Sequence, residues 1–200
     1  MNNSNRSFKR KTGISRILSI CLLMFGLVSL SFNSLASEKS TSPVFKGISE
    51  IIMVVEDVDK SIKQQWELFG IGPWQIWTFD PSSVSDMVVH DKPMDFAIKV
   101  AYTKIGETYW ELVQPLDKKS TYYEVLKTRG EGVHNIVFEV DDYQSTIRHM
   151  KDIGVGVYNS GDWQGVKFLN FDTRKVLPVI AEIFELEEGA KFPPAESTYP

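Results

Sequence analysis

The feature that most constrains the fold is an internal repeat. The segment SEIIMVVEDVDKSI (residues 49–62) resembles HNIVFEVDDYQSTI (residues 134–147) residue for residue. Apolar positions coincide, and so do the polar breaks between them, because Asp57 aligns with Asp142. Agreement at polar as well as apolar positions argues against chance similarity between two amphipathic pairs of strand and helix. The sequence therefore predicts a duplicated structural unit.

Hydrophobic periodicity predicts what each copy contains. In the first copy it indicates one strand, one helix and three further strands, at 48–55, 57–69, 74–79, 95–103 and 108–114. Asp57 is a candidate N-cap for the helix. The Pro, Ser and Asp content of residues 80–93 predicts a loop. The expected fold is α+β, with two tandem βαβββ modules forming a curved mixed sheet around a cleft. The modules span about 46–116 and 131–188, and a helix at 118–129 joins them.

The two ends of the chain differ from its middle. Five basic residues flank the start of an apolar run, Ile17 to Leu30, and Ser34 and Ala36 follow as a small-residue cleavage site. This layout predicts a signal peptide over 1–36. Residues 37–45 and 189–200 are rich in Ser, Pro and charge, which predicts a linker and a tail. We expect an exported protein, periplasmic or secreted, without stable membrane association after signal cleavage.

Charge and cysteine content exclude several classes of function and of site. Removal of 1–36 takes five of the 22 Lys and Arg residues and none of the 26 acidic ones, so the remaining chain carries a net charge of −9. It also removes the single cysteine. An acidic chain without a basic cluster is not expected to bind nucleic acid. A chain without thiols has neither disulfides nor Cys metal ligands.

Four polar residues occupy equivalent positions in the repeat. Glu50 aligns with Asn135, and Glu111 aligns with Glu182 in the related segments YWELVQPL and IAEIFEL. Each residue interrupts an apolar strand, where an unpaired carboxylate is costly unless it is protonated or bound to a cation. Two halves packed around a pseudo-twofold axis would bring the four together in one cleft. Strand alternation then places His134 on the face opposite Asn135.

These segments, in this order and spacing, resemble the vicinal oxygen chelate (VOC) superfamily, and within it the glyoxalase-like and methylmalonyl-CoA-epimerase-like branch. The residues that carry the resemblance are ISEIIMVVEDVDKSI, LFGIGPW, WELVQPL, GEGVHNIVFEVDD and LPVIAEIFE. It implies the glyoxalase/bleomycin resistance/dioxygenase fold in a single domain over 46–188. Family members often form dimers, so a homodimer is one expectation.

The resemblance also implies a metal site. Four strands of the family each supply one ligand to a divalent metal, and the matching positions here are Glu50, Glu111, Asn135 and Glu182, with both usual histidines replaced. Oxygen donors suit Mn²⁺, Mg²⁺ or Ca²⁺ better than Zn²⁺. The alternative is a site without metal, in which the carboxyl groups bind one another and the ligand with raised pKa values. We expect neither a nucleotide nor a flavin.

The function that the resemblance implies is that of a divalent-metal-dependent isomerase, epimerase or lyase acting on a small molecule. Such an enzyme moves a proton next to a carbonyl of an oxo- or hydroxy-acid derivative, with Glu182 and Glu111 as the catalytic residues. The alternative is a non-catalytic protein that sequesters a small molecule and has a degenerate metal site. Loss of both family histidines favours that alternative. Side chains expected to contact the ligand are Trp77, Lys99, Trp110 and Trp163.

Overall fold

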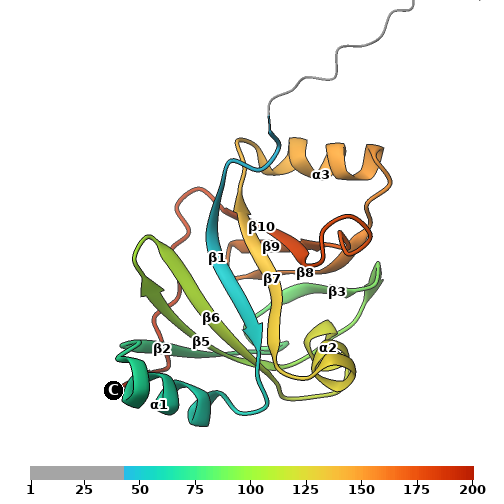
Figure 1. The fold of residues 1–200 in the computed structure, drawn as a ribbon. Coiled ribbons are helices and arrows are strands. Elements are labelled where there is room, and N and C mark those ends of the chain that lie inside the picture. Colours follow the sequence, from blue (N-terminus) through green and yellow to red (C-terminus); the bar gives the residue numbers. More distant parts are fainter. Residues whose placement is uncertain (1–42) are drawn as a thin grey trace, which may run out of the picture. The chain divides into compact units, whose positions relative to one another are not determined.

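The structure is a computed structural model that describes residues 43–200 (Figure 1). The predicted signal peptide and residues 37–42 of the predicted linker lie outside the described residues. Within residues 43–200, no helix has the length and apolar character needed to cross a membrane.

The predicted α+β fold with two tandem βαβββ modules is confirmed. The first module consists of β1 (Gly47–Val54), α1 (Val58–Phe69), β2 (Trp74–Phe79), β5 (Ile98–Ile105) and β6 (Thr108–Pro115). The second consists of β7 (Gly132–Glu139), α3 (Tyr143–Asp152), β8 (Val157–Trp163), β9 (Val166–Phe171) and β10 (Ile180–Leu186). Helix α2 (Thr121–Arg129) connects the two modules.

The pairing of the strands repeats between the modules. β1 pairs in parallel with β6, and β7 pairs in parallel with β10, while β1 and β7 run antiparallel at the centre of the sheet. The described strands form one sheet in the order β11-β2-β5-β6-β1-β7-β10-β9-β8-β3-β4. Figure 1 shows β1 and β7 side by side in the middle, with α1 and α3 at opposite ends of the sheet. This arrangement is that of two copies related by a pseudo-twofold axis between β1 and β7.

The helices of the two modules start in the same way because the repeat conserves their caps. The Asp57 side chain accepts a hydrogen bond from the Lys60 backbone amide at 3.0 Å, and Asp142 accepts one from the Ser145 amide. An aspartate in this position satisfies a backbone N–H that has no partner within the helix. Both helices then bury apolar side chains against the outer face of the sheet. The inner face is left to a separate core that surrounds a cavity.

Two segments differ from the sequence prediction. Residues 80–93, predicted as a loop, contain β3 (Ser85–Val89) and β4 (Lys92–Pro93), and β3 pairs with β8 of the other module. In the segment 189–200, predicted as a tail, β11 (Ser197–Tyr199) pairs with β2. Both segments cross from one half of the molecule to the other and so extend the sheet at its two edges.

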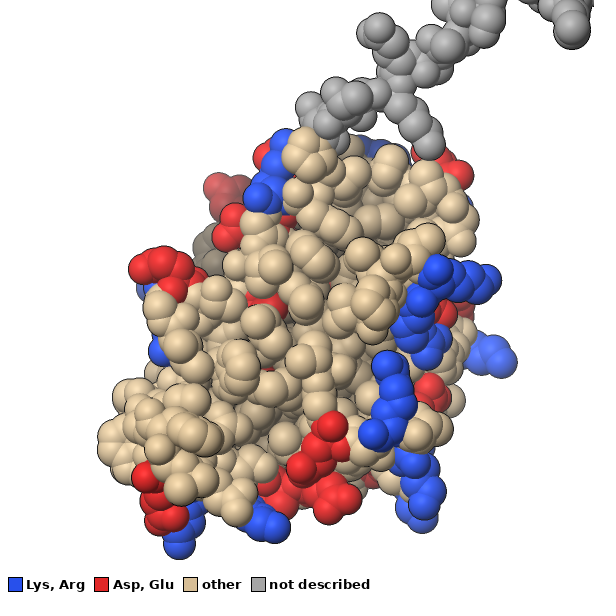
Figure 2. Space-filling model, viewed as in Figure 1, with Lys and Arg blue, Asp and Glu red and all other residues tan. Residues whose placement is uncertain are grey.

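Figure 2 shows one face of the molecule, with uncharged residues over much of its centre and most charged side chains toward its margins. Lys and Arg side chains gather along one side of this face, and Asp and Glu side chains mostly along the other.

Candidate functional site

A cavity that opens to solvent lies on the inner face of the sheet, and with the solvent at its mouth it occupies about 700 Å³. Both modules contribute to its wall. The residues that line it are Glu50, Ile52, Trp77, Phe79, Ile98, Val100, Tyr102, Glu111, Tyr122, Trp163, Val166, Phe168, Glu182, Phe184 and Phe192. A concave, mostly apolar lining with a few polar groups is typical of a small-molecule site.

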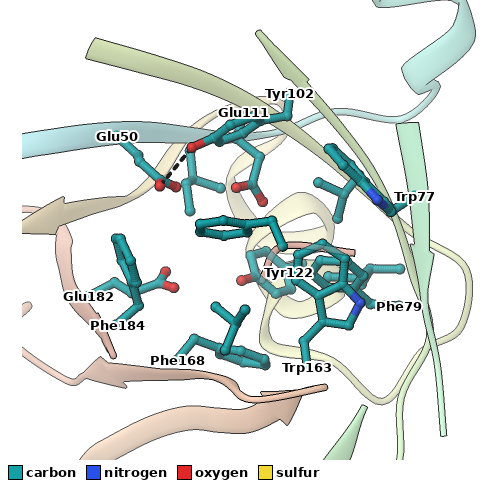
Figure 3. Close-up of a pocket in the computed structure, with 15 residues that line it drawn as sticks. Glu50, Trp77, Phe79, Tyr102, Glu111, Tyr122, Trp163, Phe168, Glu182 and Phe184 are labelled. Atoms are coloured by element: carbon teal, nitrogen blue, oxygen red, sulfur yellow. Dashed lines mark hydrogen bonds between the residues drawn. The ribbon is translucent and has the colours of Figure 1, made fainter. Parts of the chain in front are cut away.

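Three carboxyl groups from the centre of the sheet face the cavity. Glu50 comes from β1, Glu111 from β6 and Glu182 from β10, and Figure 3 shows the three side chains at one end of the cavity. Glu50 and Glu182 are buried, with 9 % and 7 % of their surfaces exposed. The convergence that the repeat predicts for these three residues is therefore present in the structure.

Burial governs the charge of these groups. Burial raises the pKa of Glu182 to about 8, and the charge of Glu50 adds to the shift. Burial raises the pKa of Glu50 to about 7, although a hydrogen bond from the Tyr102 hydroxyl at 2.9 Å opposes the shift. Burial, followed by repulsion from the two other glutamates, raises the pKa of Glu111 well above its ordinary value. Protonated and ionised carboxyl groups therefore coexist here near neutral pH.

Asn135 supports the site from behind the cavity wall. Its amide nitrogen donates a hydrogen bond to the Glu182 carboxylate, and its amide oxygen lies 2.6 Å from Nδ1 of His134. Burial lowers the pKa of His134 to about 4, so the imidazole is neutral and Nδ1–H donates to Asn135. His134, Asn135 and Glu182 thus form a buried hydrogen-bonded chain that fixes one oxygen of the carboxylate.

The position of His134 differs from the strict alternation predicted for it. The register between β1 and β7 shifts at this point, because Ile52 pairs with Asn135 and Met53 pairs with Val133. The extra residue is His134, which makes the site a β-bulge. Its ring packs 4.4 Å from that of Tyr122 on α2, with 1 % of the residue exposed, whereas Val133 is half exposed. The bulge therefore brings His134 to the side of Asn135 instead of the opposite face.

Aromatic rings form most of the remaining wall. Trp77 and Trp163 meet edge to face with ring centroids 5.6 Å apart, and Phe79 packs on Trp163 at 4.5 Å. Figure 3 shows these three rings at the end of the cavity away from Glu50 and Glu182, with Tyr122 between the two ends. The cavity is therefore acidic at one end and aromatic at the other.

The ligand-contacting residues predicted from sequence divide into two groups. Trp77 and Trp163 line the cavity. Lys99 points to the outer face of β5, where its ammonium group binds Asp59 of α1 at 2.6 Å. Trp110 packs in the core beneath α1, on the face of β6 opposite Glu111.

Sequence reasoning missed several wall residues. Alternation along β5 could have indicated Tyr102, and alternation from Glu182 could have indicated Phe184. No periodic signal marks Tyr122, which enters from α2, or Phe192, which enters from the C-terminal segment.

The fold and the site together define a protein with duplicated βαβββ modules and an open cavity lined by acidic and aromatic side chains. Residues 50–169 match the model of the Glyoxalase/Bleomycin resistance protein/Dioxygenase superfamily. The chain belongs to this superfamily, which confirms the VOC resemblance. No match was found among curated proteins.

Solved structures share the fold at low sequence identity. A hypothetical protein from Bacillus halodurans is 22 % identical, with a TM-score of 0.56, over 72 % of this chain and 97 % of the other. A methylmalonyl-CoA epimerase variant from Streptomyces coelicolor, in complex with 2-nitronate-propionyl-CoA, is 19 % identical, with a TM-score of 0.56, over 74 % and 99 %. The methylmalonyl-CoA epimerase from Mycobacterium tuberculosis is 17 % identical, with a TM-score of 0.53, over 72 % and 90 %. Similarity at this level shows the fold.

Enzymes of the VOC superfamily commonly use divalent metals, and the four positions predicted from the resemblance can be tested for such an ion. Asn135 does not fit, because His134 occupies its amide oxygen and its amide nitrogen points to Glu182. Within the part of the chain that the structure describes, no three His, Cys, Asp or Glu side chains are grouped closely enough to hold a metal ion. The three glutamates share one end of the cavity but are not grouped tightly enough to surround a single ion. The arrangement does not fit the metal site that the family implies.

Proposed function

We propose that the protein is an exported isomerase, epimerase or lyase that moves a proton next to the carbonyl group of a small molecule. The observation that carries this proposal is the set of three carboxyl groups with raised pKa values on one mostly apolar cavity. General acids and bases work best when their pKa values lie near the operating pH. The epimerase fold of the structural neighbours supports the same class of reaction.

The three glutamates take different roles in this proposal. Glu182 removes the proton from the carbon next to the carbonyl when it is ionised, a state that becomes more populated as the pH rises toward its pKa of about 8, and Asn135 holds its other oxygen in place. Glu111, whose strongly raised pKa favours the protonated form, donates its proton to the carbonyl oxygen, so that the intermediate is an uncharged enol. The reverse transfers complete the reaction. Return to carbon of a Glu182 proton that has exchanged with water introduces the solvent label. Return of a proton from protonated Glu50 gives the epimer, after which Glu182 releases a proton to water and Glu50 takes one up.

The substrate is a small oxo- or hydroxy-acid derivative whose acid group is masked, as in an ester or amide. Among the described residues, those that line the cavity include no Lys, Arg or His, and three are acidic. A free carboxylate would lose its hydration there without gaining a counter-charge, which is costly.

Solvent deuterium tests the reaction directly. The protein is incubated in D₂O with a panel of esters, amides and ketones that carry an acidic C–H bond, and deuterium incorporation is followed by NMR. We expect incorporation with wild type and its loss with Glu182→Gln. Glu185→Gln is the matched control, because it lies on the same strand with its side chain alternating to the outer face. Lack of exchange across the panel would contradict the proposal.

The resemblance to the family also predicts a bound divalent cation. Three carboxylates would favour Mn²⁺, Mg²⁺ or Ca²⁺ over Zn²⁺. The proton transfers described here do not pass through a metal, because the site does not fit one. Elemental analysis of protein purified without chelators tests this point. Stoichiometric metal in active protein would contradict the metal-free scheme.

A second function, sequestration without turnover, is favoured by the commitment of Asn135 to His134 and Glu182 and by the aromatic wall. It predicts a compound that raises the melting temperature of the protein and is recovered chemically unchanged. It also predicts no deuterium incorporation into that compound.

Export rests on the signal-peptide pattern of residues 1–36. Fractionation of cells that produce the full chain tests it. We expect a mature protein without residues 1–36 outside the cytoplasm. A full-length protein retained in the cytoplasm would contradict export.

A further inference from the structure

The cavity has a charge imbalance that its own wall does not correct. Glu50, Glu111 and Glu182 face it together, and the lining residues within 43–200 include no cationic side chain. Protonation relieves the repulsion between the carboxyl groups while no cation is present. A ligand that brings a positive charge relieves it when the cavity is filled, because a buried carboxylate is stabilised by a cation beside it.

The aromatic wall begins directly beside these carboxyl groups. The Tyr102 hydroxyl donates to Glu50 at 2.9 Å, and the Tyr102 ring also lines the cavity. That ring stacks on Tyr109 at 4.6 Å, which fixes its orientation. Trp77 lies 6.3 Å from Tyr102 and continues the wall toward Trp163. Aromatic faces attract an organic cation, and the attraction is strongest where water is excluded.

We infer that the ligand of this cavity is an organic cation, with an ammonium group at the carboxyl end and an apolar body against Trp77, Phe79 and Trp163 (Figure 3). An alkylammonium group is several ångströms wide. It therefore contacts carboxyl groups spread around a wall, which a bare metal ion does not do. The inference deepens the proposed function, on which it rests for the reaction, because it adds a cationic nitrogen to the carbonyl substrate.

A charge series built on one benzyl group tests this inference. The probes are benzyltrimethylammonium, its uncharged isostere neopentylbenzene and the anion phenylacetate, and binding is followed by the fluorescence of Trp77 and Trp163. We expect the cation to bind at least about tenfold more tightly than the uncharged isostere, and the anion to bind most weakly.

Two variants test whether the charge of Glu50 causes the preference for the cation. Glu50→Gln keeps the shape of the side chain and removes the charge, so the preference for the cation should fall several-fold. Glu67→Gln, on α1 and away from the cavity, removes the same charge from the surface and should leave the preference unchanged. If Glu50→Gln does not fold, the charge series with wild type still decides the matter.

The outcomes separate this inference from the proposed reaction. Equal binding of the cation and its uncharged isostere, tighter binding of the anion, or no binding of the cation would overturn the inference. Deuterium exchange into uncharged carbonyl compounds would leave the proposed reaction standing in that case. The opposite result is that the cation binds selectively but no carbonyl compound with an ammonium group exchanges deuterium. That result would uphold the inference and contradict the proposed reaction.

Discussion

Glu50 and Glu182 lie in register on either side of Val137, one on β1 and the other on β10. The strand between them, β7, carries Val137 almost completely buried. The repeat produces this relationship, because Glu50 belongs to the first module and Glu182 to the second. Two carboxyl groups that are far apart in sequence therefore share one cavity, and the charge of Glu50 helps to raise the pKa of Glu182.

Glu182 should make the protein less stable as the pH rises. Its pKa is raised from an ordinary 4.5 to about 8, so between these values the folded protein holds a proton that the unfolded chain has released. The stabilising contribution of the protonated group is complete below about pH 4.5 and is lost as the pH rises through about 8. Glu182→Gln should flatten this decline. Urea unfolding at several pH values measures the decline in the free energy of unfolding. A parallel decline in wild type and variant would show that Glu182 does not cause it.

His134 should be needed for stability although it does not line the cavity. His134→Ala removes the ring packed against Tyr122 and leaves the buried amide oxygen of Asn135 without its donor. We expect a loss of about 2–4 kcal/mol in the free energy of unfolding. His149→Ala, at an exposed position of α3, should change it by less than about 0.5 kcal/mol. Equal effects of the two substitutions on the urea midpoint would contradict this interpretation.

The repeat explains why much of the fold was predictable from sequence. A duplicated pattern of apolar and polar positions predicts both the strands and their symmetric pairing. The alignment of Glu50 with Asn135 in this pattern therefore predicted that polar side chains of the two modules lie together in the cavity. The alternation of a single strand, in contrast, does not reveal a bulge. The insertion of His134 depends on the packing of α2 over β7, which is a tertiary effect.

The cavity was only partly predictable for a related reason. Trp77 and Trp163 line it, whereas Trp110 and Lys99 face outward, although all four lie on strands. Which face of a strand is inward follows from the pairing register, and the composition of a strand does not determine it. The C-terminal segment gave no signal at all, because its strand forms only by pairing with β2.

The two aspartate caps should contribute equally to stability because they occupy equivalent positions. Asp57→Ala and Asp142→Ala each remove the acceptor for a backbone amide in the first turn of a helix. Each should cost about 1 kcal/mol of unfolding free energy, and the costs should add because the two helices do not touch the same core cluster. Lys60→Ala, at an exposed position in the first turn of α1, should cost less than Asp57→Ala. Urea titration of the single and double variants checks this, and strong non-additivity would argue against independent modules.

The C-terminal segment should control access to the aromatic end of the cavity. Trp77 Nε1 donates to the carbonyl oxygens of Pro193 and Pro194 at 3.2 and 3.0 Å, and this anchors the segment where Phe192 enters the wall. Phe192 lies 6.3 Å from the rings of both Trp163 and Phe184, yet 53 % of its surface is exposed.

Phe192→Ala should therefore weaken the binding of benzyltrimethylammonium several-fold, because it removes part of the apolar surface that the ligand body contacts. The melting temperature should change little, since an exposed ring contributes little to the core. Phe69→Ala, at the exposed end of α1, is the matched control and should leave binding unchanged. Fluorescence titration together with thermal unfolding distinguishes the two effects. Unchanged affinity in Phe192→Ala would show that the ligand does not reach this end of the cavity.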